Sequence, residues 1–111
     1  MLVAMQDGVA VGYAMAQLDG AEIVLYLLYI HPQWKGRGIG SALLDAIVAD
    51  YPDAKAVRLE VLRDNVAAIA WYKTKGFDIY GETKNATGTR NIAALYMDKR
   101  LDRISDANDG R

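Results

Sequence analysis

Three hydrophobic runs, separated by two Asp-Gly pairs, make up the first 30 residues. The runs span Leu2–Met5, Val9–Leu18 and Glu22–Ile30. Asp-Gly between apolar runs is a strong signal for a hairpin turn, so we expect three consecutive antiparallel strands. Gly12, inside the second run, predicts a weak point or a bulge in that strand. The third run is almost continuously apolar, which is typical of a strand buried on both faces.

A helical period follows the third run. Pro32 ends the strand because proline has no N–H to donate to a ladder. From about Gly38 to Ala49 the apolar residues recur at the spacing of a helix with one buried stripe. That stripe consists of Ile39, Leu43, Leu44, Ile47 and Val48. Tyr51-Pro52-Asp53 ends the helix.

The next stretch combines a strand with a second helix. From Val57 to Val61 apolar residues alternate with charged ones, which predicts a strand. Asp64 or Asn65 is expected to cap a helix that runs to Lys75, because both side chains accept hydrogen bonds from the first helical N–H groups. Gly76 then supplies the residue that follows a helix end.

Two further strands are expected at Phe77–Gly81 and Asn91–Met97, with a polar loop at Glu82–Arg90 between them. The element order is therefore β-β-β-α-β-α-β-β. This order predicts an α/β (α+β) fold, with a mixed, largely antiparallel sheet, a central βαβ unit and covering helices. We expect a single domain over residues 1–100 and a polar C-terminal tail over 101–111.

Composition excludes several chemistries. The chain has 111 residues, of which 52% are hydrophobic and 24% charged, and its net charge is −1. It has no cysteine, so disulfides and a cysteine nucleophile are excluded, and its one histidine, His31, excludes a multi-histidine metal cluster. The charge favours neither nucleic acid nor an anionic membrane as a partner. No apolar run reaches the roughly 18–20 residues that span a bilayer, so we expect a cytoplasmic location.

The segment Lys35–Ser41, Lys-Gly-Arg-Gly-Ile-Gly-Ser, lies between the third strand and the first helix. Glycines at alternate positions let a ligand approach the backbone, since no Cβ stands in the way. The first N–H groups of the following helix lack partners within it and lie at the positive end of its dipole. We therefore expect an anion site for a pyrophosphate here, with a simple tight turn as the alternative.

These features together resemble the GNAT superfamily of acyl-CoA-dependent N-acetyltransferases. The resemblance rests on Leu28-Tyr29-Ile30-His31-Pro32, on the glycine loop, and on the run from Leu59-Glu60-Val61 through Asn65, Ala68, Tyr72, Gly76 and Phe77. It covers about Val9 to Leu101. It implies a GNAT-like acyl-CoA N-acyltransferase fold and transfer of an acetyl group from acetyl-CoA to an amine, with no metal.

The resemblance also implies which residues hold acetyl-CoA. The strand segment before the loop binds the pantetheine arm through its backbone, the glycine loop binds the pyrophosphate, and an asparagine contacts the pantetheine or phosphate region. The residues so implied are Leu28, Tyr29, Ile30, Lys35, Gly36, Arg37, Gly38, Ile39, Gly40, Ser41 and Asn65. Lys35 stands where the family usually has glutamine or arginine, a mild departure because the loop binds mainly through main-chain N–H groups.

Two catalytic residues are implied in the same way. Tyr72 matches the tyrosine that protonates the leaving thiolate, and Glu60 matches the general base of enzymes similar to the ribosomal-protein alanine N-acetyltransferases. In many other members the base lies elsewhere. Periodicity alone favours Tyr72 as a buried aromatic residue of the second helix, and the spacing shared with the family reverses this. Glu60 is alternatively a solvated strand residue paired with Arg58 or a lysine, and Asn65 is most simply a helix cap.

One departure concerns the acceptor. Members of the superfamily usually begin with a strand and two helices that form a wall of the acceptor site, whereas this sequence starts at the hairpin. Either another chain, as in a homodimer, supplies this wall, or the protein is a shortened version of the fold. The acceptor, a small-molecule or peptide amine, stays open. The alternatives to an enzyme are a CoA-binding module without turnover and, less favoured, a nucleotide-binding domain, because Gly-Lys-Ser/Thr and a Rossmann-type start are missing.

Overall fold

The computed structural model of the protein describes residues 1–101, and the chain divides into two compact units after Ala54. Apart from Leu101, the predicted polar tail lies outside the described residues. The single domain expected over residues 1–100 stays a prediction.

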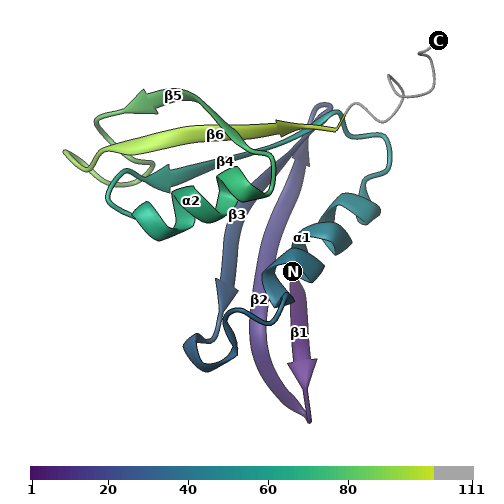
Figure 1. Ribbon diagram of the computed structural model, residues 1–111. Helices are drawn as coiled ribbons and strands as arrows, with labels where there is room; N and C mark the ends of the chain where they lie inside the picture. The colour runs from purple at the N-terminus through teal and green to yellow at the C-terminus, as the bar shows by residue number, and fades with distance from the viewer. Residues whose placement is uncertain (102–111) are drawn as a thin grey trace. The chain divides into compact units, whose positions relative to one another are not determined.

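The order of strands and helices is the predicted one (Figure 1). The first unit contains β1 (Leu2–Gln6), β2 (Val9–Asp19), β3 (Glu22–Ile30), a short 3-10 turn (Pro32–Trp34) and α1 (Ile39–Asp50). The second contains β4 (Ala56–Leu62), α2 (Val66–Thr74), β5 (Asp78–Thr83) and β6 (Ala94–Arg100). The α/β class with largely antiparallel strands is thus confirmed.

Both predicted hairpins of the first unit form, with β1 and β3 each antiparallel to β2. The first turn has positive φ at both central residues, Asp7 and Gly8, which matches the twist of the flanking strands. The second turn lies one residue later than predicted. Asp19 still pairs with Glu22, so the two loop residues are Gly20 and Ala21. A glycine with positive φ at the first loop position suits this two-residue turn.

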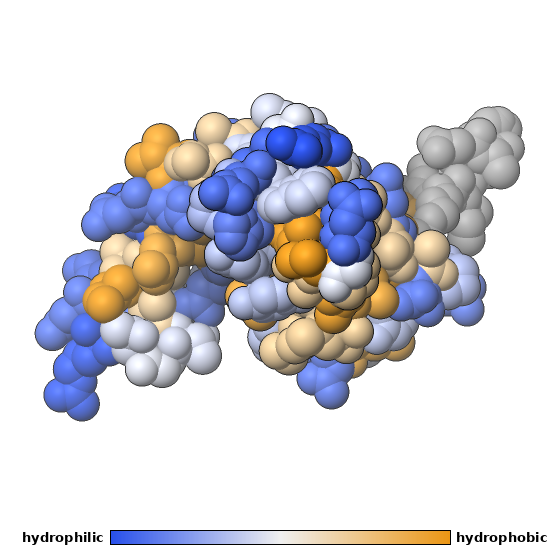
Figure 2. Space-filling model, turned by 90° about the horizontal axis from the view of Figure 1, so that it is seen from below, coloured by the Kyte–Doolittle hydropathy of each residue, from blue (hydrophilic) through white to orange (hydrophobic). Residues whose placement is uncertain are grey.

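One face of this three-stranded sheet is covered by α1, which contacts β1, β2 and β3 (Figure 1). The buried helix residues Leu43, Leu44 and Ile47 belong to the predicted stripe. They share the core of the unit with apolar residues of the strands, which are Val11, Ala14, Ile23 and Leu25. The sheet also exposes large apolar side chains, among them Val3 and Met5. On the face shown in Figure 2, apolar residues reach the surface between hydrophilic ones.

The expectation that the third strand is buried on both faces is wrong beyond Leu25. Tyr26, Leu27 and Tyr29 are 60%, 37% and 40% exposed. The strand also contains a bulge: Leu25 pairs with Ala16 and Leu27 with Met15, which leaves Tyr26 as an extra residue. A bulge reverses the alternation of side chains, so Leu27 and Tyr29 no longer share the face of Ile23 and Leu25.

Gly12 lies beside a second bulge, as its position in the apolar run suggested. Ala4 pairs with Gly12 and Met5 with Ala10, which leaves Val11 as the extra residue of β2. A Cβ on Gly12 would stand 2.9 Å from both Ile30 Cδ1 and the carbonyl oxygen of Tyr29. Only glycine permits this approach of β2 to β3 without a shift of the backbone.

In the second unit, β6 pairs antiparallel with both β4 and β5. Its core contains the alternating residues of β4, apolar residues of β6 and the residue just before β5, namely Val57, Leu59, Val61, Ala94, Met97 and Phe77. The helix α2 is capped by Asn65, whose Oδ1 accepts the N–H of Ala68 at 3.2 Å, and Gly76 follows its end with φ 95°. The cap and the stop signal are thus confirmed.

The last two strands are shifted relative to the sequence prediction. Strand β5 continues to Thr83 because Glu82 and Thr83 pair with Leu95 and Ala94. The polar loop therefore covers residues 84–93 rather than starting at Glu82. Asn91, predicted to begin a strand, instead adopts φ 63° and donates its N–H to Asn85 Oδ1 at 2.8 Å.

Candidate functional site

The glycine loop has the predicted strand–turn–helix setting within the first unit. Gly36 and Gly38 have φ values of 78° and 82°, in the left-handed region that other residues rarely adopt. A Cβ built at either position meets nothing within 4 Å, so the space above the loop is open. Gly38 is the N-cap of α1 and provides no side-chain hydrogen bond to it. The first N–H groups of α1 are therefore left for a ligand.

Side chains around the loop add positive charge. Lys35 and Arg37 are exposed, as expected, and the guanidinium of Arg37 lies 4.6 Å from the centre of the Trp34 ring. This cation–π contact holds the charge near the loop. His31 Nδ1 accepts the N–H of Gln33 at 3.2 Å and so caps the 3-10 turn, which fits a polar strand-end residue.

The strand segment Leu28–Ile30 pairs with β2 up to the loop. Ile30 pairs with Gly12 and Tyr29 with Tyr13, and the two tyrosine rings lie 5.1 Å apart. Beyond the bulge, Leu28 and Ile30 are half-buried whereas Tyr29 is exposed. The first unit therefore brings together ten of the eleven residues that were predicted to hold the cofactor, all except Asn65.

Glu60 lies in the second unit, on β4 opposite Tyr96 of β6. Its carboxylate accepts two hydrogen bonds from one residue of the loop 84–93. The backbone N–H of Thr87 donates to Oε2 at 2.7 Å, and the Thr87 hydroxyl donates to Oε1 at 2.6 Å. The sequence prediction missed Thr87, because a threonine 27 positions away in a polar loop has no spacing that links it to Glu60.

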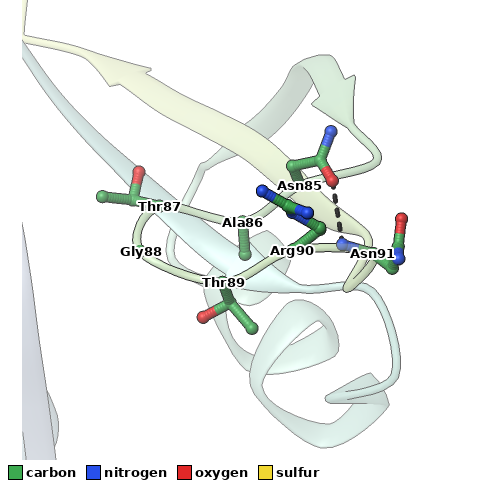
Figure 3. Close-up of a pocket in the computed structure, with 7 residues that line it drawn as sticks. All are labelled: Asn85, Ala86, Thr87, Gly88, Thr89, Arg90 and Asn91. Atoms are coloured by element: carbon green, nitrogen blue, oxygen red, sulfur yellow. Dashed lines mark hydrogen bonds between the residues drawn. The ribbon is translucent and has the colours of Figure 1, made fainter.

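The loop that carries Thr87 surrounds an open hollow lined by residues 85–91 (Figure 3). The hydrogen bond between Asn85 and Asn91 closes one end, and Thr87 lies at the other end, away from that bond (Figure 3). Two backbone bonds hold the intervening chain: Ala86 N–H donates to Ile92 O at 2.7 Å, and Thr89 N–H to Ala86 O at 2.8 Å.

Tyr72 lies on α2 among aromatic rings. The centres of the Phe77 and Trp71 rings are each 5.3 Å from that of Tyr72, in edge-on arrangements. Burial raises the pKa of Tyr72 to about 12, since a phenolate would lose its hydration there. The hydroxyl therefore keeps its proton at neutral pH, so it can donate or accept a hydrogen bond or act as an acid, but it is not available as a phenolate base.

The described residues contain no group of three or more His, Asp and Glu side chains that could hold a metal ion. No helix in the same part of the chain is long and apolar enough to cross a membrane. The chemistry available in the two units is thus a positively charged glycine loop in one, and a carboxylate and a protonated phenol in the other.

Comparison with known proteins gives a consistent result. The model of the acetyltransferase (GNAT) family matches residues 1–77. The Mycobacterium tuberculosis protein named N-alpha-acetyltransferase RimI is 35% identical over 82 residues, which cover 70% of this chain and 51% of that protein. The chain therefore spans about half the length of this curated relative.

Solved structures share the fold. The ribosomal-protein-S18-alanine N-acetyltransferase of Escherichia coli superposes with a TM-score of 0.75 and 27% identity, over 87% of this chain and 65% of that one. Arabidopsis thaliana Naa50, in complex with the bisubstrate analogue CoA-Ac-MVNAL, gives a TM-score of 0.76 and 26% identity, over 87% and 70% of the two chains.

Proposed function

This chain is a member of the acetyltransferase (GNAT) family, and from this we propose that it transfers an acetyl group from acetyl-CoA to a primary amine by direct attack in a ternary complex. The observation that carries the proposal is the glycine loop. Its two left-handed glycines leave open space, and its helix begins without a side-chain cap, as the binding of a pyrophosphate requires. Lys35 and Arg37 add charges that complement phosphate groups.

The reaction needs one proton removed and one supplied. Acetyl-CoA contributes the activated thioester. A bond forms between the amine nitrogen and the acetyl carbon, the carbon–sulfur bond breaks, and its electron pair leaves with sulfur. Glu60 takes the proton that the amine loses, and Tyr72 donates a hydrogen bond to the leaving sulfur. The products are an N-acetyl amide and the free thiol, and atoms and charges balance because the proton taken by Glu60 reaches the sulfur through water.

The raised pKa of Tyr72 limits how it acts. With a pKa of about 12 it is a much weaker acid than a thiol, whose pKa is about 8.5. Full proton transfer to a free thiolate would cost about 5 kcal/mol at about 1.4 kcal/mol per pKa unit. We therefore propose that Tyr72 stabilises charge on sulfur by a hydrogen bond while the carbon–sulfur bond breaks, and that water completes the protonation.

The acceptor that fits best is the α-amine of a peptide. An α-amine has a pKa of about 7.7–8.0, so about a tenth of it is neutral at pH 7, whereas a lysine side chain with a pKa of about 10.4 is almost entirely protonated. A single carboxylate such as Glu60 can more easily remove the proton from an α-amine than from a lysine side chain, because the α-amine holds its proton less tightly. The names of the relatives point the same way: one acetylates a ribosomal-protein alanine, and another was solved with an acetylated peptide joined to CoA.

A thermal-shift titration followed by a transfer assay tests the proposal. A ligand at 100 times its Kd should stabilise the fold by about 2.7 kcal/mol. We expect this shift with CoA and acetyl-CoA but not with NAD or ATP, and we expect thiol release with peptides whose N-terminus is free. Matched peptides with a blocked N-terminus and an internal lysine should react far more slowly.

Other outcomes point to the alternative functions. Tight CoA binding without transfer to any amine would indicate a CoA-binding module. Stabilisation by NAD or ATP alone would indicate a nucleotide-binding domain and would refute the proposal. The homodimer and the cytoplasmic location stay predictions.

A further inference from the structure

The contact between Glu60 and Thr87 joins a strand to a loop that lies 27 positions away. We infer that Thr87 is the positioning residue of Glu60: its N–H and hydroxyl fix the carboxylate in the orientation that accepts the proton of the attacking amine. The inference rests on the proposed function, because it gives Glu60 the role of base.

Both partners of this contact are held by their own surroundings. Glu60 is fixed on β4 through the pairing of that strand with β6. Thr87 follows Ala86, which is 6% exposed and donates its N–H to Ile92 O. Because Thr87 occupies both carboxylate oxygens with two separate donors, the plane of the carboxylate cannot rotate without the loss of one bond.

The contact leaves the carboxylate free to act as a base. An ionised carboxylate has about four lone-pair sites, and Thr87 occupies two of them. Each oxygen can therefore accept a further proton or a water molecule while the contact persists. Thr87 directs which lone pairs remain available, and a base must lie within hydrogen-bond reach of the proton it removes.

The hydroxyl has a second property that the backbone N–H lacks. A threonine hydroxyl can donate or accept, whereas a backbone N–H only donates. When Glu60 gains a proton, the hydroxyl can rotate and accept a hydrogen bond from the new carboxylic acid. Thr87 therefore supports Glu60 both before and after proton transfer, and a side chain without a hydroxyl would lose this support.

A variant series separates positioning from simple loop anchoring. Thr87→Val removes the hydroxyl and keeps the shape and the N–H, Thr87→Ser restores the hydroxyl, and Thr89→Val removes a hydroxyl from the same loop. Steady-state kinetics with acetyl-CoA and a free-N-terminus peptide give kcat and KM. A double-mutant cycle of Thr87→Val, Glu60→Gln and the double variant compares their free energies of unfolding in urea. It detects the interaction between the two residues and does not depend on enzyme activity.

We expect Thr87→Val to lower kcat by about tenfold to a hundredfold, the range for a hydrogen bond to a charged group, with the KM for acetyl-CoA unchanged. Thr87→Ser should restore most of kcat, and Thr89→Val should match the wild type. The unfolding cycle should be non-additive, because both variants break the same contact.

Three results would overturn the inference, and each points to a different failure. An additive cycle means that the two residues do not interact. A non-additive cycle with normal kcat in Thr87→Val means that the contact only anchors the loop. If the unfolding cycle is non-additive but the wild-type protein acetylates no amine, then the proposed function fails, and the positioning role fails with it.

Discussion

Tyr72 makes a prediction that requires neither cofactor nor acceptor. Burial raises its pKa to about 12 in the folded protein, against about 10 in an unfolded chain. Between these values the unfolded chain has lost the phenolic proton and the folded protein still holds it. Stability must therefore fall as pH rises through this window, and Tyr72→Phe should abolish that part of the fall.

The size of the effect follows from the same two values. Stability changes by about 1.4 kcal/mol per pH unit while the two states differ by one proton. Over the full window of about two pH units, the loss approaches about 3 kcal/mol. Between pH 9.5 and 11.5, where lysines begin to titrate in both variants alike, we expect the wild type to lose about 2 kcal/mol more than Tyr72→Phe. Below about pH 9 the difference between the two should be constant.

Urea unfolding of the wild type and of Tyr72→Phe across this range measures the difference directly. Tyr80→Phe is the matched control, since it removes the same group from a ring that is 54% exposed. A wild-type curve that stays parallel to that of Tyr72→Phe up to pH 11.5 would refute the reasoning. It would mean that the Tyr72 hydroxyl is hydrated in the folded protein. Its pKa would then not be raised by burial, and burial would no longer weaken Tyr72 as an acid.

Further predictions concern the backbone. Gly38→Ala should weaken CoA binding at least about tenfold by calorimetry, because a side chain there strains the left-handed backbone and fills the space above the loop. Gly8→Ala, with φ 79° in the β1–β2 turn and equally open space, should cost similar stability and leave CoA affinity unchanged; an equal loss of affinity would argue against the loop. Gly12→Ala should destabilise the fold by about 1–3 kcal/mol in urea, since its Cβ meets a backbone oxygen; no change would show that β2 and β3 separate easily. Asn65→Ala should cost about 1 kcal/mol and Asn65→Ser much less, again in urea; equal losses would mean that the cap bond is not what stabilises α2.

The sequence allowed the elements and their order to be predicted because their signals are local. A turn at Asp7-Gly8 depends on two residues, and the stripe of α1 depends on positions three and four apart. The cap at Asn65 and the stop at Gly76 are equally local. The glycine loop is also a local feature, since its backbone conformation depends on its own glycines. Such features can be predicted without knowledge of which segments pack against them.

The bulge beside Gly12 had a local signal in that glycine, but the bulges at Tyr26 and Tyr80 did not. An extra residue at Tyr26 reverses which side chains of β3 face α1, yet the apolar run there has no break. Tyr80 is the corresponding residue of β5, because Ile79 pairs with Met97 and Gly81 with Tyr96. A bulge is decided by how two strands match over their whole length, and a single strand carries little trace of it.

The Glu60–Thr87 contact shows why the roles of site residues are harder to predict than their identity. Glu60 could be singled out from the resemblance, whereas its place in an alternating strand alone marked only a charged strand residue. Its partner depends on the register of β4 with β6 and on the closure of the loop 84–93, both of which are set by pairing between distant segments. A carboxylate on a strand is equally a solvated residue, a loop anchor or a base until its partner is known. The structure supplies that partner, and the choice between anchor and base then becomes a measurable difference between the loss of stability and the loss of kcat when the hydroxyl of Thr87 is removed.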